Sequence, residues 1–559
     1  MLRITRRVQK PTLLYLLIVI AVSLAFTWPA LVHGLPDLSN DGIDHARWGM
    51  NFATQFWQGE PYPRWLTATN GGLGAPALFF YPSMANYGSV VFRPLVAAHD
   101  PDGYIGAGWS AVLAGLIAAM TCYFWLCELA SPSAALFGTM LYIMSPYHLA
   151  IDLYNRGALA EYWAFAWMPL VLLAAKRCAE GRRWGVPMLA ISYGCLAFTH
   201  LPTVVCFSWA VPLAVWMMSG LGKRVAAFVR MSLGVALGIG LAAVYLVPAM
   251  LDQKKSWVAD QITGNSWFYY RNNFLITRLV SPVEYKARVL FLVLSMVVCS
   301  VVFWSLTRRG DDQRKRLALL FALIGLGSLF MMTQLSIPVY EVFRFVQTIQ
   351  FPTRFASPLT LALVSLAALA FPFLKQSRSA MAVVVLLVTG WLGADAWAGA
   401  TAFSAWRKVP QTRIDADRKA MDLKREYYSL WPKPADYNLS ELPKLVPFLE
   451  AHPARSLVLD MPGASATAEK WRPREILIHV HAPENGRMTV NHFYYADWRG
   501  SIDSRSVAVT PTPEGLILVE IPRGDYTLKL ELIHDKPERA GLWISAISLL
   551  SIGVLAIVI

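Results

Sequence analysis

Several polar segments between long apolar runs carry side chains that could move a proton or hold an anion. The first, SNDGIDHARW at residues 39–48, contains Asp41, Asp44 and His45. A carboxylate beside a histidine can take a proton from a hydroxyl group, so Asp44 is a candidate general base. Alternatively, Asp41 and Asp44 only cap a helix that starts near His45. The local sequence leaves both interpretations open.

The second segment, DLYNRGALAE at residues 152–161, places acids and a guanidinium group together at a predicted helix junction. Ionisable groups near a membrane cost free energy unless they are paired or functional. Arg156 could form a structural pair with Asp152 or with Glu161, or it could face a ligand. On the local sequence, Glu161 is therefore either one half of a structural ion pair or a functional acid.

Further basic residues lie in aromatic-rich stretches, namely Arg271, Arg344 and Arg354. Guanidinium forks suit phosphate, and several of them converging with aromatic rings would make a lipid-phosphate site. Each one alone is equally typical of a side chain reaching from the membrane to its interface. His200, in FTHLPT, could hydrogen-bond a phosphate or a sugar, or be an ordinary histidine at a helix end.

The composition places these segments in a polytopic membrane protein. Of 559 residues, 56% are hydrophobic and 15% are charged, whereas soluble domains have about a quarter charged residues. A membrane-spanning helix needs about 20 apolar residues. We predict twelve spans, the first being a retained helix rather than a cleaved signal peptide. Their apolar runs are 13–31, 105–126, 134–151, 162–175, 186–198, 204–218, 225–250, 289–306, 317–332, 359–374, 381–396 and 542–559.

The net charge of +14 comes from short basic clusters between the apolar runs. Such spacing indicates membrane topology and argues against a nucleic-acid partner, because each cluster should face the cytoplasm. Consecutive clusters must then be separated by an even number of spans. This condition excludes the weaker candidate at 77–98, which we expect to lie along the outer interface. Both termini are thus predicted in the cytoplasm, with the first outer loop at 33–103 and the second at 152–161.

The region 401–539 changes its hydrophobic period. Short alternating runs separated by proline and glycine turns predict a small extracytoplasmic β-sandwich, followed by a last spanning helix at 540–559. All six cysteines lie in or beside the predicted spans, so no disulfide or zinc framework is expected.

In combination, these segments resemble the GT-C superfamily of membrane glycosyltransferases. The resemblance is strongest to YfhO-like proteins and to the 6-pyruvoyl-tetrahydropterin synthase-related membrane proteins. The motifs that carry it are Asp44-His45, YPRW (62–65), GLGAP (72–76), FYP (80–82), RGA (156–158) with Glu161, THLP (199–202), QFPTRF (350–355) and NHFYYADW (491–498).

The resemblance implies a GT-C-like transmembrane domain at 1–400 in the bacterial cytoplasmic (inner) membrane. It implies inverting transfer of a sugar from a polyprenyl-phosphate donor to a cell-envelope glycan or lipid acceptor, among membrane lipids. Asp44 would be the general base and Glu161 the second acid, and Mg²⁺ or Mn²⁺ is compatible with this chemistry. Arg156, Arg271, Arg344, Arg354 and His200 would bind the donor phosphate, and His45, Arg64, Trp65 and Tyr81 would line the substrate cleft.

Two other classes of function fit the sequence less well. A lipid or solute transporter should carry polar groups near the membrane midplane, whereas here they gather at one predicted face. A non-catalytic membrane protein could use the β-domain to bind a glycan or a partner protein. Turnover of a labelled donor separates this last class from an enzyme.

Overall fold

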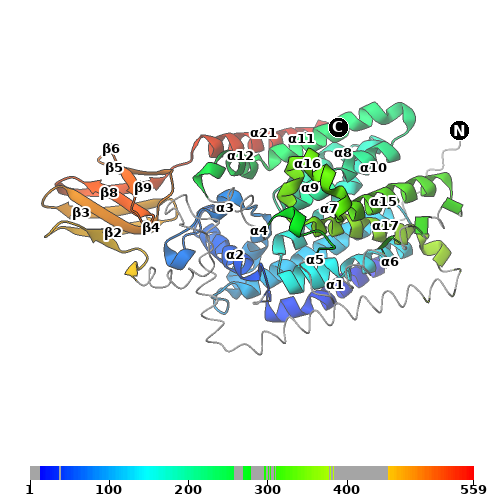
Figure 1. Ribbon diagram of the computed structural model, residues 1–559, viewed down its shortest axis with the longest axis horizontal. Helices are drawn as coiled ribbons and strands as arrows, with labels where there is room; N and C mark the ends of the chain where they lie inside the picture. Colours follow the sequence, from blue (N-terminus) through cyan, green and yellow to red (C-terminus); the bar gives the residue numbers. More distant parts are fainter. Residues whose placement is uncertain are drawn as a thin grey trace.

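The computed structural model describes residues 13–36, 39–256, 268–277, 310–374 and 451–558, with a few single positions between them. A β-sandwich lies at one end of an elongated molecule and a bundle of helices forms the rest (Figure 1). The last helix, α21 (Lys536–Val558), runs from the sandwich back along α12 and α11.

The bundle is built mostly from apolar helices. They are α1 (Leu13–His33), α5 (Tyr104–Cys127), α6 (Pro132–Ile143), α7 (Leu159–Glu180), α8 (Gly185–Ala197), α9 (Leu201–Phe207), α10 (Ala210–Met218), α11 (Arg224–Leu241), α12 (Ala243–Leu251), α15 (Asp312–Met331), α16 (Ile337–Val342) and α17 (Ala356–Leu374). The described part of the chain holds seven helices long and apolar enough to cross a membrane, or eight if a pair bent by 91° at 332–333 is one span.

The sequence-based count of twelve spans therefore stays a prediction. Most of the predicted runs at 289–306 and 381–396 lie outside the described residues. The weaker candidate at 77–98 forms two short helices, α3 (Ala77–Phe80) and α4 (Met84–Val96). Neither is among the candidate spans, and α4 packs against α5 and against α2 (Gly42–Trp57).

The predicted run at 134–151 is not one regular helix. It breaks after α6 and continues as a ten-residue π-helix, η2 (Tyr147–Arg156). Gly157 ends this element with φ +63°, and a Cβ there would lie 2.3 Å from Ser39 Oγ. The first outer loop, residues 33–103, contains α2, α3 and α4. Its first residues pack directly against the end of η2, and the Asp41 N–H donates to the Arg156 carbonyl at 2.7 Å. The π-helix, an uncommon element often found at functional sites, brings its last turn against this loop.

The predicted β-rich region is confirmed as two antiparallel sheets with one shared core. The sheet orders are β1-β4-β8-β7 and β2-β3-β9-β5-β6. The strands are β1 (Leu457–Leu459), β2 (Ser465–Arg472), β3 (Glu475–Ala482), β4 (Gly486–Phe493), β5 (Trp498–Ile502), β6 (Arg505–Val507), β7 (Val509–Pro511), β8 (Leu516–Ile521) and β9 (Gly524–Leu532). Residues 401–450 lie outside the described ranges, and α21 begins at Lys536 rather than at 540.

A lysine with three carboxylates ties the sandwich to the helices. Lys255, just after α12, lies 2.9 Å from Asp252, 2.9 Å from Asp497 before β5, and 2.5 Å from Asp535 before α21. One positive charge faces three negative charges, which leaves excess negative charge in a half-buried place. Burial, together with the Asp535 carboxylate, raises the pKa of Asp252 to about 6.

We predict that Asp252→Asn changes how stability depends on pH. The raised pKa means that the folded wild type takes up a proton that the unfolded chain binds only near pH 4, so stability rises as the pH falls from 7 to 5. This group should contribute about 1 kcal/mol over that interval. The thermal midpoints of both proteins are measured in detergent between pH 5 and 7. As the pH falls, the midpoint of the wild type should rise relative to that of the variant. Parallel curves would contradict this assignment.

Candidate functional site

Five charged side chains from four segments form one acid–guanidinium cluster: Asp41, Asp152, Arg156, Glu161 and Arg354. Arg156 Nη1 lies 2.9 Å from Asp152 Oδ1 and 2.8 Å from Glu161 Oε2. Arg354 Nε lies 3.3 Å from the same Glu161 oxygen. Arg156 Nη2 lies 3.6 Å from Asp41 Oδ2, which is an ion pair but longer than a hydrogen bond.

The cluster is buried at one side and open at the other. The side chains of Asp152 and Glu161 are 0% and 1% exposed, whereas those of Arg156 and Asp41 are 19% and 41% exposed. Buried ions need close partners of opposite charge, and the two buried acids and two arginines supply equal charge. Asp41 therefore marks the side from which a ligand can approach.

Local structure explains how each charged group reaches the cluster. Glu161 lies in the first turn of α7, where the helix dipole favours a negative charge. Arg354 lies in the short helix η8 (Pro352–Phe355), which follows a turn at Gln350 with φ +64°. Its Nη1 donates to the Ile349 carbonyl at 2.7 Å, and its guanidinium lies 5.1 Å from the centre of the Phe351 ring. The turn and these two contacts fix the guanidinium against Glu161.

Aromatic and polar side chains surround the charged groups. The Tyr147 hydroxyl donates to Glu161 Oε1 at 2.7 Å. His200 precedes α9, is hydrogen-bonded to Thr203 at 2.8 Å, and interacts electrostatically with Glu161. Tyr81, which follows α3, lies within electrostatic range of Asp41, Arg156, Glu161 and Arg354.

The candidate base Asp44 lies on α2, one turn after Asp41, and is partly exposed. His45 is buried, with its ring edge-on to that of Tyr81 at 5.8 Å between centroids. Asp41 stands at the N-cap position of α2 but makes no side-chain capping hydrogen bond. Its carboxylate faces Arg156 instead, so the capping interpretation does not describe Asp41.

Two of the four predicted phosphate-binding arginines lie elsewhere. Arg271 pairs with Glu341 at an exposed position, and Arg344 is exposed at the start of the short helix η7 (Arg344–Ile349). Of the four arginines, Arg156 and Arg354 meet at Glu161, and phosphate binding by Arg271 and Arg344 stays a prediction. A shared membrane face fixes the depth of a side chain but not its lateral position.

Arg64 and Trp65, expected in a substrate cleft, point toward the sandwich and α21. Arg64 is 4% exposed, donates to the Val244 carbonyl at 2.6 Å and lies 3.2 Å from Glu538 of α21. Trp65 is fully buried, and its indole N–H donates to His492 Nε2 at 2.9 Å. A buried guanidinium needs a counter-charge and a buried indole needs an acceptor, and α21 and β4 supply them.

The arrangement can bind an anion beside a carboxylate that accepts a proton. The two guanidinium groups that share the buried Glu161 suit a phosphate, and the partly exposed carboxylate of Asp41 lies 3.6 Å from Arg156. Within the described ranges, no group of three His, Cys, Asp or Glu side chains is placed to hold a metal ion. Sequence reasoning considered Asp41 only as a cap and missed Tyr147, which lies inside a run counted as apolar.

Comparisons with known proteins support a membrane family. A family model described as a 6-pyruvoyl-tetrahydropterin synthase related domain, membrane protein, matches residues 105–403. A search of curated proteins finds no match. Among solved structures, ArnT from Cupriavidus metallidurans bound to undecaprenyl phosphate is similar with a TM-score of 0.40 and 16% identity, over 80% of this chain and 82% of that chain.

We predict that Glu161→Gln destabilises the protein far more than Tyr147→Phe. The first change leaves two buried guanidinium groups short of a negative charge, which costs about 3–5 kcal/mol. The second removes one hydrogen bond to the same carboxylate, which costs about 1 kcal/mol. Unfolding in detergent, followed by tryptophan fluorescence, measures both. Equal losses would mean that Glu161 does not hold the two arginines.

Proposed function

This chain belongs to the 6-pyruvoyl-tetrahydropterin synthase-related family of membrane proteins, and we propose that it is a GT-C-type glycosyltransferase. It would transfer a sugar, with inversion, from a polyprenyl-phosphate-linked donor to an acceptor hydroxyl outside the cytoplasmic membrane. One observation carries the proposal: Arg156 and Arg354 share the buried Glu161, and Arg156 also faces Asp41, which lies one helical turn before the partly exposed Asp44.

The two arginines are suited to the phosphate of the donor. Arg156 Nη1 is occupied by Asp152 and Glu161, whereas Nη2 points to the more exposed side of the cluster. When the bond between sugar and phosphate breaks, the phosphate oxygen keeps the electron pair and gains negative charge. Fixed guanidinium groups stabilise such developing charge because they need no reorganisation. His200, beside Glu161, would add a hydrogen bond to the phosphate or the sugar.

Asp41 and Asp44 are partly exposed, so the proposal assigns the acceptor to the start of α2. In the proposed step, Asp44 takes the proton of the acceptor hydroxyl. At the same time, the oxygen of that hydroxyl attacks the anomeric carbon from the side opposite the phosphate. Asp41 already faces Arg156 and would orient it. Tyr81 and His45, whose rings are in contact, would form one wall of the cleft for the sugar.

The direction of α7 supports placing this site on the outer face. The helix begins beside the cluster at Leu159 and ends at Glu180, and its 22 residues give a length of about 33 Å that matches the thickness of a bilayer. At its far end, Lys176 and Arg182 form ion pairs with Glu128. Basic clusters mark the cytoplasmic side, so the proposal places the acid–guanidinium cluster outside and both termini inside a bacterial inner membrane.

We predict that Asp44→Asn abolishes sugar transfer while the protein stays folded. The amide cannot accept the proton, and loss of a general base lowers the rate by about 10²–10⁴-fold. Asp41→Asn is the matched comparison one helical turn away, and it should retain more activity than the Asp44 variant. Purified protein with a radiolabelled polyprenyl-phosphate sugar and envelope glycolipid acceptors measures both rates.

The outcomes of this experiment separate the assignments. Full activity of the Asp44 variant with loss in the Asp41 variant would move the base to Asp41. If the wild type transfers no sugar and a deletion strain has unchanged envelope glycans, the proposed enzymatic activity is contradicted and a non-catalytic role is favoured.

A further inference from the structure

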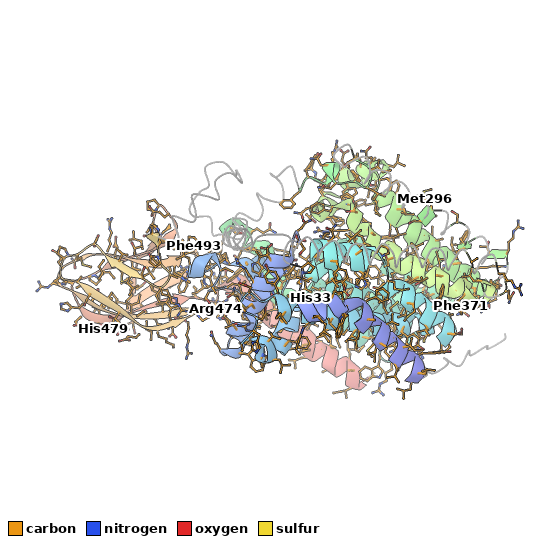
Figure 2. The ribbon with its side chains drawn as sticks, turned by 90° about the horizontal axis from the view of Figure 1, so that it is seen from below. His33, Met296, Phe371, Arg474, His479 and Phe493 are labelled. Atoms are coloured by element: carbon orange, nitrogen blue, oxygen red, sulfur yellow. The ribbon has the colours of Figure 1, made fainter. Side chains whose placement is uncertain are left out.

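The first loop is held from the side of the β-sandwich by a set of contacts that we call the loop–sandwich junction: Trp65 and Leu73 of the loop with Arg474, His492 and Phe493 of the sandwich. The Phe493 N–H donates to the Leu73 carbonyl at 2.8 Å. In Figure 2, Arg474 and Phe493 lie at the end of the sandwich nearest the helices, and His479 lies toward the opposite end. The sandwich thus meets the loop through backbone as well as side chains.

Trp65 is the centre of the junction. Its ring lies 5.3 Å from His492, 6.0 Å from Tyr495 and 6.2 Å from Trp498, measured between centroids. Its indole hydrogen bond requires a neutral His492 with Nε2 as the acceptor. Burial, with a smaller contribution from Arg455, lowers the pKa of His492 to about 3, so it stays neutral at physiological pH. The contact is therefore permanent rather than pH-switched in that range.

The loop beyond Trp65 is a series of tight turns closed by its own hydrogen bonds, among them that of the Asn70 amide to the Gly74 carbonyl at 2.9 Å. A single bridge joins Leu66 to Ala75, and Asn70, Gly72 and Gly74 all have positive φ. A Cβ on Gly74 would lie 2.5 Å from the Trp65 ring, and one on Gly72 would lie 2.7 Å from the Ala454 side chain. The glycines are thus needed for close packing against Trp65 and the sandwich. Its contacts with Trp65 and with the sandwich therefore add to its internal hydrogen bonds in keeping it in one conformation.

An ion network reinforces the junction. Arg474, between β2 and β3, lies 2.8 Å from Glu538 of α21 and 3.6 Å from Glu60 of the first loop. Glu538 also pairs with Arg64 at 3.2 Å, and both side chains are at most 5% exposed. Three parts of the chain, the loop, the sandwich and the last helix, therefore share one buried set of charges.

The held loop leads directly to the candidate site. On its other side, Gln55 of α2 donates to the Trp65 carbonyl at 2.8 Å and accepts from the Thr67 N–H at 2.9 Å. The same helix carries Asp44 near its start, and Tyr81 follows the loop through α3. Moving the loop would move both the helix with the candidate base and the ring beside the cluster.

We propose that the β-sandwich is a positioning domain. Through Trp65 it fixes the first loop and α2 relative to the acid–guanidinium cluster, and His492 is its key positioning residue. This role deepens the proposed function, because the positioned groups are those of the sugar-transfer site. The sandwich would thus be a fixed part of the catalytic unit rather than an independent binding module.

Hydrogen exchange on the full chain in detergent tests this role. His492→Ala should lower the hydrogen-exchange protection of the amides in 66–80 by about tenfold. This is the effect expected from losing the buried hydrogen bond of the Trp65 indole and the packing of the two rings. His492→Gln, whose amide can accept from the indole, should restore the protection. His479→Ala, an exposed histidine on β3 of the same domain, is the matched control and should change nothing in the loop.

A second variant guards against unfolding of the sandwich. Trp65→Phe removes the N–H from the loop side and leaves the sandwich sequence intact. It should lower protection of 66–80 while β3 and β8 stay protected. Unchanged loop protection in Trp65→Phe, and in any folded His492→Ala protein, would overturn the proposal.

The transfer assay adds a readout that general stability does not give. His492→Ala should lower kcat for sugar transfer by about fivefold while the donor KM stays close to wild type, because geometry rather than phosphate binding is disturbed. His492→Gln should recover kcat. Equal kcat in His492→Ala and wild type would overturn the positioning role. If the wild type itself transfers no sugar, the proposed function fails, whereas the exchange experiment still decides whether the sandwich holds the loop.

Discussion

The ion pairs of Glu161 with Arg156 and Arg354 are the constraint on which the site depends. A carboxylate that is 1% exposed persists only with close positive partners, and Glu161 has two. Those partners come from the end of a π-helix and from a short helix after a left-handed turn, so distant segments must meet at this point. The position of α7, η2 and η8 relative to one another follows from this requirement.

The same requirement accounts for the length of the first loop and for its many contacts with η2, the sandwich and α21. The loop must bring the start of α2 to the open side of the cluster, where Asp41 faces Arg156 at 3.6 Å. Two separate sets of ion pairs attach the sandwich to the helices. In one, Lys255 after α12 pairs with Asp497 of the sandwich, and in the other, Arg474 of the sandwich pairs with Glu538 of α21. Trp65 then transmits the position of the sandwich to the loop. A small C-terminal domain thereby contributes to a site formed mostly by residues before 360.

Sequence reasoning predicted the features that leave a local pattern. Apolar runs and basic clusters predicted a helical membrane protein, and alternation predicted the β-region. The short spacing of Arg156 from Asp152 and Glu161 made an ion pair with either acid one of the open interpretations. By contrast, the approach of Arg354 to Glu161 spans almost 200 residues and leaves no local pattern. Tryptophan and glycines suit a sugar cleft and a domain contact equally, so the docking of Trp65 on His492 was not predictable.

Affinity for polyprenyl phosphate tests the central claim most directly, because it asks whether the paired arginines recognise a lipid-linked phosphate. Binding of a short-chain polyprenyl phosphate to the purified protein should be compared with binding of the matching polyprenol, in wild type and in Arg354→Lys. The wild type should clearly prefer the phosphate, and this preference should weaken in the variant, because lysine cannot reproduce the guanidinium fork. Equal affinity of the wild type for phosphate and alcohol would contradict it.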